Sequence, residues 1–118
     1  MKESNIICEM SFDFSLKIIG LYKILQEHKE YILSKQLLRS ATSVGANVEE
    51  AIAAQSKKDF ISKMSIASKE ARESRYWLRL LDKSKLVDIN YLSYLESVQH
   101  LINILTKIVK TSTESSHS

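Results

Sequence analysis

Glycine and proline are almost missing from this chain, which has two glycines and no proline among its 118 residues. Hairpins and short strand-to-helix turns rely on both residues, because glycine reaches positive φ and proline presets a turn-compatible φ. The composition therefore argues against a β-sandwich, a doubly wound dinucleotide-binding fold and a glycine-rich phosphate loop. What remains favoured is an all-α protein.

Apolar residues recur at helical spacing in four segments, which predict helices at about 11–28, 35–54, 57–83 and 89–110. Short connections between them favour an up-down antiparallel four-helix bundle. Residues 1–110 would form this single domain, and the small polar residues 111–118 would form a disordered tail. The expected core positions are Phe14, Ile18, Leu21, Leu25, Leu37, Ala41, Val44, Gly45, Val48, Ala51, Ile52, Phe60, Met64, Ala67, Ala71, Leu78, Tyr91, Leu95, Val98, Ile102, Leu105 and Val109.

Polar residues in front of these segments are candidate helix caps. Ser11 or Asp13, Ser34 and Asp88 would cap the first, second and fourth helices. Ser56 followed by Asp59 resembles a capping box at the start of the third helix.

Length and charge limit the class of protein further. A mass of 13.5 kDa suits one domain, and the single cysteine, Cys8, cannot form an internal disulfide. With neither a signal peptide nor a membrane-spanning segment in the sequence, we expect a cytoplasmic protein with no membrane partner. The net charge of +3 is mild, but residues 56–85 carry nine basic and four acidic side chains, so the positive excess is local.

The second helix has two unusual sides. One side is the apolar arc around Gly45, where a close approach of another helix would explain a glycine inside a helix. The opposite side is small and polar rather than covered by long solvated side chains. It is either an alanine-rich exposed surface or, as we favour, a contact with another subunit, to which we assign Arg39, Ser43, Ala46, Asn47, Glu50, Glu70 and Glu73. Arg39 and Glu50 are too far apart to pair with each other, so each would need a partner across a contact.

The third helix separates its charges. Glu70 and Glu73 fall inside its widened apolar arc, whereas Arg72, Arg75, Arg79 and Lys83 form a ridge on the opposite side. Like charges four residues apart repel one another. The ridge is therefore a solvated face, a phosphate-binding surface or a set of salt bridges to a neighbouring subunit.

Catalytic and metal chemistry find little support in the sequence. Di-iron bundles repeat a Glu-x-x-His motif on two helices, but neither Glu70 nor Glu73 is followed by a histidine at this spacing, and Glu96 and His100 are four residues apart rather than three. We expect no metal, no cofactor and no enzymatic activity. Glu70 and Glu73 are better explained as buried or half-buried carboxylates paired with Arg39 or another cation.

Three stretches resemble the bacterial four-helix-bundle proteins of the 23S rRNA intervening-sequence family. They are QLLRSATSVGANVEEA at 36–51, SKKDF at 56–60 and KEARESRYWLRLL at 69–81. The resemblance runs from about Asn5 to Val109. It departs at Ala41, where glycine would be expected, and at Ser74, where threonine would be expected.

This resemblance implies an up-down bundle assembled as a ring, most often a homopentamer. A related branch comprises accessory proteins of diversity-generating retroelements, which bind nucleic acid and a reverse transcriptase. Our leading hypothesis is a non-enzymatic ring that binds the RNA or DNA backbone through Lys57, Lys58, Arg72, Arg75, Arg79 and Lys83. The alternative is a protein-interaction scaffold or accessory subunit, for example of a reverse transcriptase.

Overall fold

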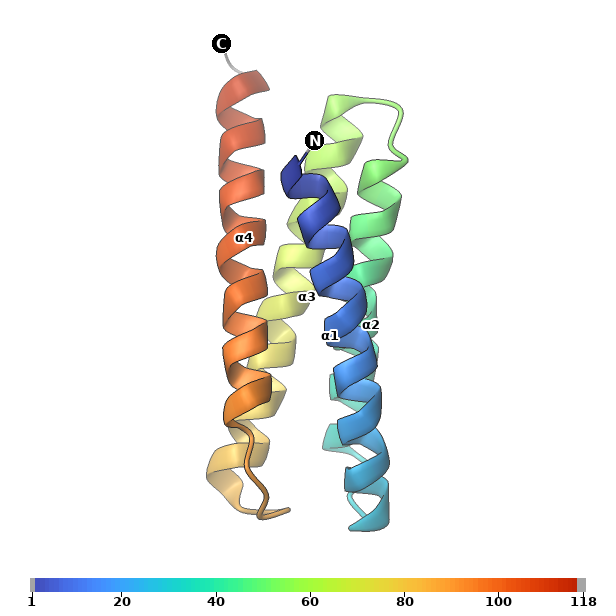
Figure 1. The fold of residues 1–118 in the computed structure, drawn as a ribbon, viewed down its shortest axis with the longest axis vertical. Helices are drawn as coiled ribbons and strands as arrows, with labels where there is room; N and C mark the ends of the chain where they lie inside the picture. Colours follow the sequence, from blue (N-terminus) through green and yellow to red (C-terminus); the bar gives the residue numbers. More distant parts are fainter. Residues whose placement is uncertain (1, 117–118) are drawn as a thin grey trace.

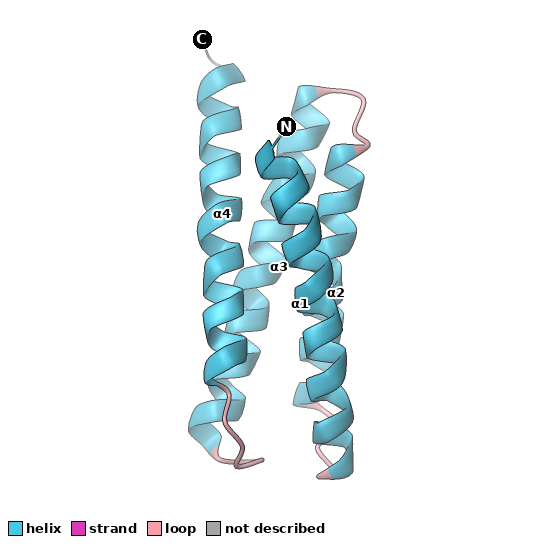
Figure 2. Ribbon diagram, viewed as in Figure 1, coloured by secondary structure: helices cyan, strands magenta, loops and turns pink. Residues whose placement is uncertain are grey.

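Four long helices account for nearly the whole chain in the computed structural model, which describes residues 2–116 (Figure 1). The helices are α1 (Lys2–Glu27), α2 (Leu33–Ile52), α3 (Lys57–Ser84) and α4 (Leu92–Ser116). Each packs against its neighbours in chain order, and α4 closes the bundle against α1. No strand occurs within the described residues, and the loops lie at the two ends of the bundle (Figure 2). The predicted all-α four-helix architecture is confirmed.

Two helices, α1 and α4, extend well beyond their predicted bounds. α1 begins at Lys2 rather than near residue 11, because Ile7 and Ser11 are buried and so tie the first turns to the bundle. α4 continues to Ser116, so the expected disordered tail is helical over 111–116, where neither glycine nor proline interrupts the helix. Residues 117–118 lie outside the described part of the chain.

The helix caps follow the sequence prediction only in part. Ser56 caps α3 as predicted, since its hydroxyl accepts the amide N–H of Asp59 at 3.0 Å. Ser34 lies inside α2 instead of capping it. At the start of α4, the side chain of Asn90 rather than that of Asp88 accepts the Leu92 N–H, at 2.9 Å.

A buried carboxylate takes the place of the Ser34 cap. Glu30 is only 8% exposed, and its oxygens accept the backbone N–H groups of Ile32 and Leu33 at 3.1 Å and that of Ser34 at 2.6 Å. The first N–H groups of a helix have no partner within the helix, so these three bonds satisfy donors that would otherwise be unpaired. The α1–α2 loop is therefore anchored by a side chain two residues ahead of the N-cap residue, Ile32.

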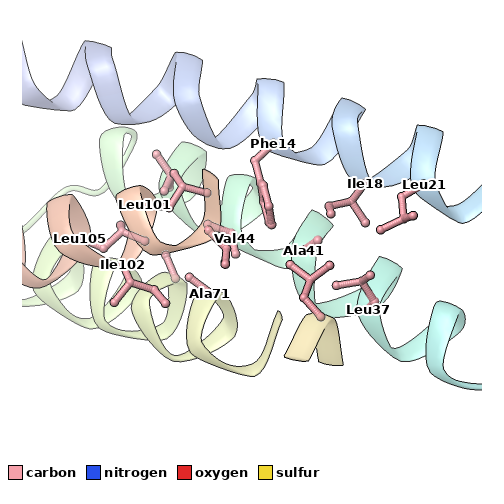
Figure 3. Close-up of a cluster of buried hydrophobic side chains, with 14 of the residues drawn as sticks. Phe14, Ile18, Leu21, Leu37, Ala41, Val44, Ala71, Leu101, Ile102 and Leu105 are labelled. Carbon is pink, nitrogen blue, oxygen red and sulfur yellow. The ribbon is translucent and has the colours of Figure 1, made fainter. Parts of the chain in front are cut away.

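The core runs along the centre of the bundle. Side chains of α1 such as Phe14 and Ile18 point toward Ala41 and Val44 of α2, with residues of α3 and α4 completing the cluster (Figure 3). Most of the expected core positions are buried. Ile52 is an exception at 44% exposed, because it is the last residue of α2, at the edge of the apolar arc. Phe60, Leu95 and Val109 are half-buried against the core.

Gly45 faces α1. A Cβ atom added there would lie 3.5 Å from the backbone oxygen of Ser11 and from the hydroxyl of Ser15, which is ordinary van der Waals contact. The expected close approach of a helix therefore exists, and it leaves room for one methyl group.

Within residues 2–116, no helix is both long enough and apolar enough to span a membrane.

Candidate nucleic-acid interface

Six basic side chains of α3 share one face of the helix. At 100° per residue they fall within an arc of about 100°; they are Lys57, Lys58, Arg72, Arg75, Arg79 and Lys83. The last four, in the C-terminal half of α3, are called the basic ridge below. Three of the four are exposed and Arg75 is half-buried.

The two lysines lie away from the ridge. Lys57 is the first residue of α3 and precedes Arg72 by fifteen residues, or about 22 Å along the helix axis. Its ammonium group donates a 2.7 Å hydrogen bond to the hydroxyl of Ser115, near the end of α4. The structure thus places two separate basic zones on one face, at opposite ends of α3.

Neutral side chains of α4 accept hydrogen bonds from two residues of the ridge, Arg72 and Arg75. Arg72 Nη2 donates to Thr106 Oγ1 at 3.0 Å, and Arg75 Nη1 donates to Gln99 Oε1 at 2.9 Å. Gln99 in turn donates to the Asn103 side chain at 3.0 Å. These contacts orient the two guanidinium groups while leaving their charge uncompensated.

These polar residues of α4 were not predicted from the sequence. Gln99, Asn103, Thr106 and Lys110 nevertheless recur at spacings of four, three and four residues. This second, polar periodicity marks the face of α4 that lies beside α3.

Ion pairs occur elsewhere in the described residues. They join Arg39 to Glu70 and to Glu73, Lys63 to Glu50, and Lys85 to Asp88. None of these pairs involves the basic ridge. Glu70 and Glu73 of α3 face α2 and pair with Arg39 there, on the side of the helix away from the ridge.

Arg39 is the centre of a cluster between α2 and α3. Its Nη1 donates to Glu70 Oε2 at 3.2 Å and its Nη2 donates to Glu73, whose Oε2 also accepts the Trp77 indole N–H at 3.0 Å. The Trp77 hydrogen bond, with Arg39 adding to it, lowers the pKa of the Glu73 carboxyl below its usual value. The expected pairing of both glutamates with Arg39 is therefore confirmed.

The partners of Arg39 and Glu50 differ from those expected from the sequence. Both residues were expected to need a partner across a contact with another subunit, but each finds one on α3 of its own chain; for Glu50 it is Lys63, at 3.4 Å. The charges therefore supply no argument for a subunit contact. Ala46 and Glu50 are exposed and Ser43 and Asn47 are half-buried, and their role in an interface stays a prediction.

The single cysteine, Cys8, lies in the part of α1 that precedes the predicted start of this helix near residue 11. Cys8 is half-buried within α1, and burial together with the carboxylates of Glu49 and Glu9 raises the pKa of its thiol. A raised pKa disfavours the nucleophilic thiolate. Over the described residues, no three His, Cys, Asp or Glu side chains are grouped closely enough to hold a metal ion.

Comparison with known proteins relates the chain to one family. A family model described as "23S rRNA-intervening sequence protein" matches residues 3–109. A crystal structure from Bacteroides thetaiotaomicron, described as a protein with unknown function from the S23 ribosomal protein family, is 43% identical. That match covers 92% of this chain and 98% of the other, with a TM-score of 0.87. No significant match is found among curated proteins.

Proposed function

This chain belongs to the 23S rRNA-intervening sequence protein family, and from that premise we propose that it is a non-enzymatic protein of the cytoplasm that binds the RNA or DNA backbone. The basic ridge of α3 is the binding surface. One observation carries the proposal: four cations lie on one face of a helix, and none of them is ion-paired within the described residues.

Electrostatics supports this choice of ligand. Phosphate contacts by Lys and Arg release counterions and require no particular base sequence. Arg72 and Arg75 are held by neutral acceptors, so their remaining N–H groups stay available for phosphate oxygens. Because phosphate contacts do not depend on the base sequence, we expect the ridge to bind nucleic acid with weak sequence preference.

Assembly would strengthen such binding. We propose that the chain forms a homopentameric ring, in which the formal charge of +3 per chain becomes about +15 and five weak sites act together. The small-residue side of α2, with Ala46 exposed, is the proposed contact between subunits.

The test is fluorescence anisotropy with a labelled single-stranded RNA at several salt concentrations. Wild-type affinity should fall steeply with salt, and an R72E/R75E/R79E variant should lose binding. The matched control is K23E/K35E/K107E, which makes the same change in net charge at three exposed lysines outside the ridge. Binding that survives the ridge variant, or falls equally in the control, rules out the ridge.

A second candidate function is a protein-interaction scaffold, such as an accessory subunit of a reverse transcriptase. The observation favouring it is an exposed apolar stripe on α1, where Phe12 is 60% and Leu16 is 54% exposed. This function predicts that one defined protein is retained by the chain after nuclease treatment and released by an F12S/L16S variant. Retention that depends on nucleic acid would favour the first function.

A further inference from the structure

A groove between α3 and α4 lies directly beside the basic ridge. Its volume is about 310 Å³, and the residues that line it are Ser65, Ser68 and Arg72 of α3 with Thr106, Val109 and Lys110 of α4. Two of these side chains are cationic, three carry hydroxyl groups, and none of the described lining residues is acidic. This volume is at the small end of the range for ligand pockets.

We infer that this groove is a binding site for a single phosphate group. The inference rests on the proposed function where the phosphate belongs to a nucleic-acid backbone, and it stands alone where the phosphate belongs to a free phosphorylated small molecule. Lys110, Thr106 and the two serines are assigned here a role in binding that the ridge alone did not suggest.

Arg72 is already oriented across the groove. Its hydrogen bond to Thr106 uses one of the five N–H donors of the guanidinium group, and four remain for phosphate oxygens. Holding a long side chain in place before binding lowers the entropic cost of binding. Thr106 is therefore a positioning residue, which acts through Arg72.

The hydroxyl groups of Ser65 and Ser68 complete the donor set. Within the described residues neither makes a side-chain hydrogen bond, so both are free to donate to an anion. They precede Arg72 by seven and four residues, so the three residues line one side of the groove along about two turns of helix. Lys110 supplies the second positive charge from the opposite side.

Arg39 and Arg72 differ in whether a carboxylate compensates their charge. Arg39 also lies between two helices, but there two glutamates from the neighbouring helix compensate its charge. At Arg72 the neighbouring helix offers only a neutral hydroxyl group. A guanidinium group and an ammonium group without carboxylate partners, next to free hydroxyl groups, match the donor pattern that a phosphate requires.

The experiment follows backbone amide signals of the full chain by NMR during titration at low salt with ribose 5-phosphate, with ribose as the phosphate-free probe. We expect the signals of Ser65, Ser68 and Thr106 to shift with ribose 5-phosphate and not with ribose. K110Q should weaken binding at least five-fold. K107Q, which removes an exposed lysine one turn earlier on the same helix, should weaken it less than two-fold.

The positioning role of Thr106 has its own readout. T106V should weaken ribose 5-phosphate binding about three-fold and leave the unfolding midpoint unchanged, because the methyl group replaces a hydroxyl group at an exposed position. The inference would be overturned if ribose 5-phosphate shifted the amide signals of all surface lysines. It would also be overturned if K110Q and K107Q lost the same affinity for ribose 5-phosphate.

A single-stranded RNA then identifies the source of the phosphate. If the site takes a backbone phosphate, K110Q should reduce the slope of log affinity against log salt by about 0.7. If K110Q leaves this slope unchanged while ribose 5-phosphate still shifts the NMR signals of the groove residues, the groove binds a free phosphorylated small molecule. Retained shifts with no RNA binding by the wild-type chain would refute the proposed function and leave the groove site standing.

Discussion

The hydroxyl oxygens of Ser40 and Ser74 lie 2.8 Å apart in the middle of the α2–α3 interface, and both residues are fully buried. Each hydroxyl group also reaches a carbonyl of its own helix, of Leu37 at 3.2 Å and of Glu70 at 3.0 Å. The pair therefore links the two helices next to the Arg39 cluster, and it requires small side chains at both positions.

We expect S40A and S74A to be energetically coupled. Removing one hydroxyl group leaves the other without its partner across the interface, so a double-mutant cycle should give a coupling of about 0.5–1.5 kcal/mol. Urea denaturation of the wild type, the two single variants and the double variant measures it. Additive losses would show that the two hydroxyl groups act independently.

Glu30 should contribute to stability through the backbone of α2. E30A removes the acceptor of three N–H groups at a buried site, and we expect a loss of about 1–3 kcal/mol in the free energy of unfolding. Glu27 is the matched control: it is exposed, and E27A should change stability by less than about 0.5 kcal/mol. Equal effects of the two substitutions in urea denaturation would contradict this account.

Tyr91 should make the fold sensitive to alkaline pH. Its phenol is buried and donates a 2.8 Å hydrogen bond to the backbone oxygen of Val87, and burial raises its pKa from 10.0 to about 12. The unfolded chain therefore loses this proton first. The contribution of the protonated Tyr91 to the free energy of unfolding is therefore complete below pH 10. It is lost as the pH rises toward 12, at up to about 1.4 kcal/mol per pH unit.

The urea midpoint at pH 8 and at pH 11 tests the role of Tyr91. The midpoint should fall more in the wild type than in Y91F, which keeps the ring and has no proton to lose. If both proteins show the same fall, lysine deprotonation rather than Tyr91 sets the alkaline limit.

Gly45 should accept alanine and reject leucine. The space beside it admits one methyl group, and alanine in a helix is favoured over glycine, so G45A should stabilise the bundle by up to about 1 kcal/mol. G45L should destabilise it by more than about 1 kcal/mol through overpacking against α1. G20A provides the reference, since nothing lies within 4 Å of a Cβ atom at Gly20. Thermal unfolding of the three variants measures these changes in stability. A G45L protein as stable as the wild type would contradict the described contact between Gly45 and α1.

The proposed ring predicts a particle several-fold heavier than 13.5 kDa by light scattering. A46R should reduce this mass, because it places a long charged side chain in the proposed contact. T111R, at an exposed position of α4, should leave the mass unchanged. A wild-type monomer at micromolar concentration would refute the ring.

Residue spacing alone predicted much of the bundle. The recurrence of Phe14, Ile18 and Leu21 places apolar side chains on one face, and burial of that face follows from the hydrophobic effect alone. The ends of the helices were harder to predict. Ser34 looks like a helix cap in sequence, but Glu30 caps α2 from a buried position, which depends on how the α1–α2 loop folds back.

The candidate site was predictable on α3 and not on α4. The shared face of Arg72, Arg75 and Arg79 follows from helical spacing within one segment. The contacts of Arg75 with Gln99 and of Arg72 with Thr106 join residues 24 and 34 positions apart, and they depend on how far one helix is shifted along the other.

The sequence by itself determined four amphipathic helices, their buried faces and the separation of Glu70 and Glu73 from the basic ridge on α3, because helical period and side-chain polarity are local properties. The tertiary structure decided which charges are compensated. Arg39 meets two glutamates across the α2–α3 interface, whereas Arg72 meets a hydroxyl group across the α3–α4 groove. The physical reason is that an ion pair needs atoms within a few ångströms, and only the packing of the helices brings residues more than thirty positions apart to that distance.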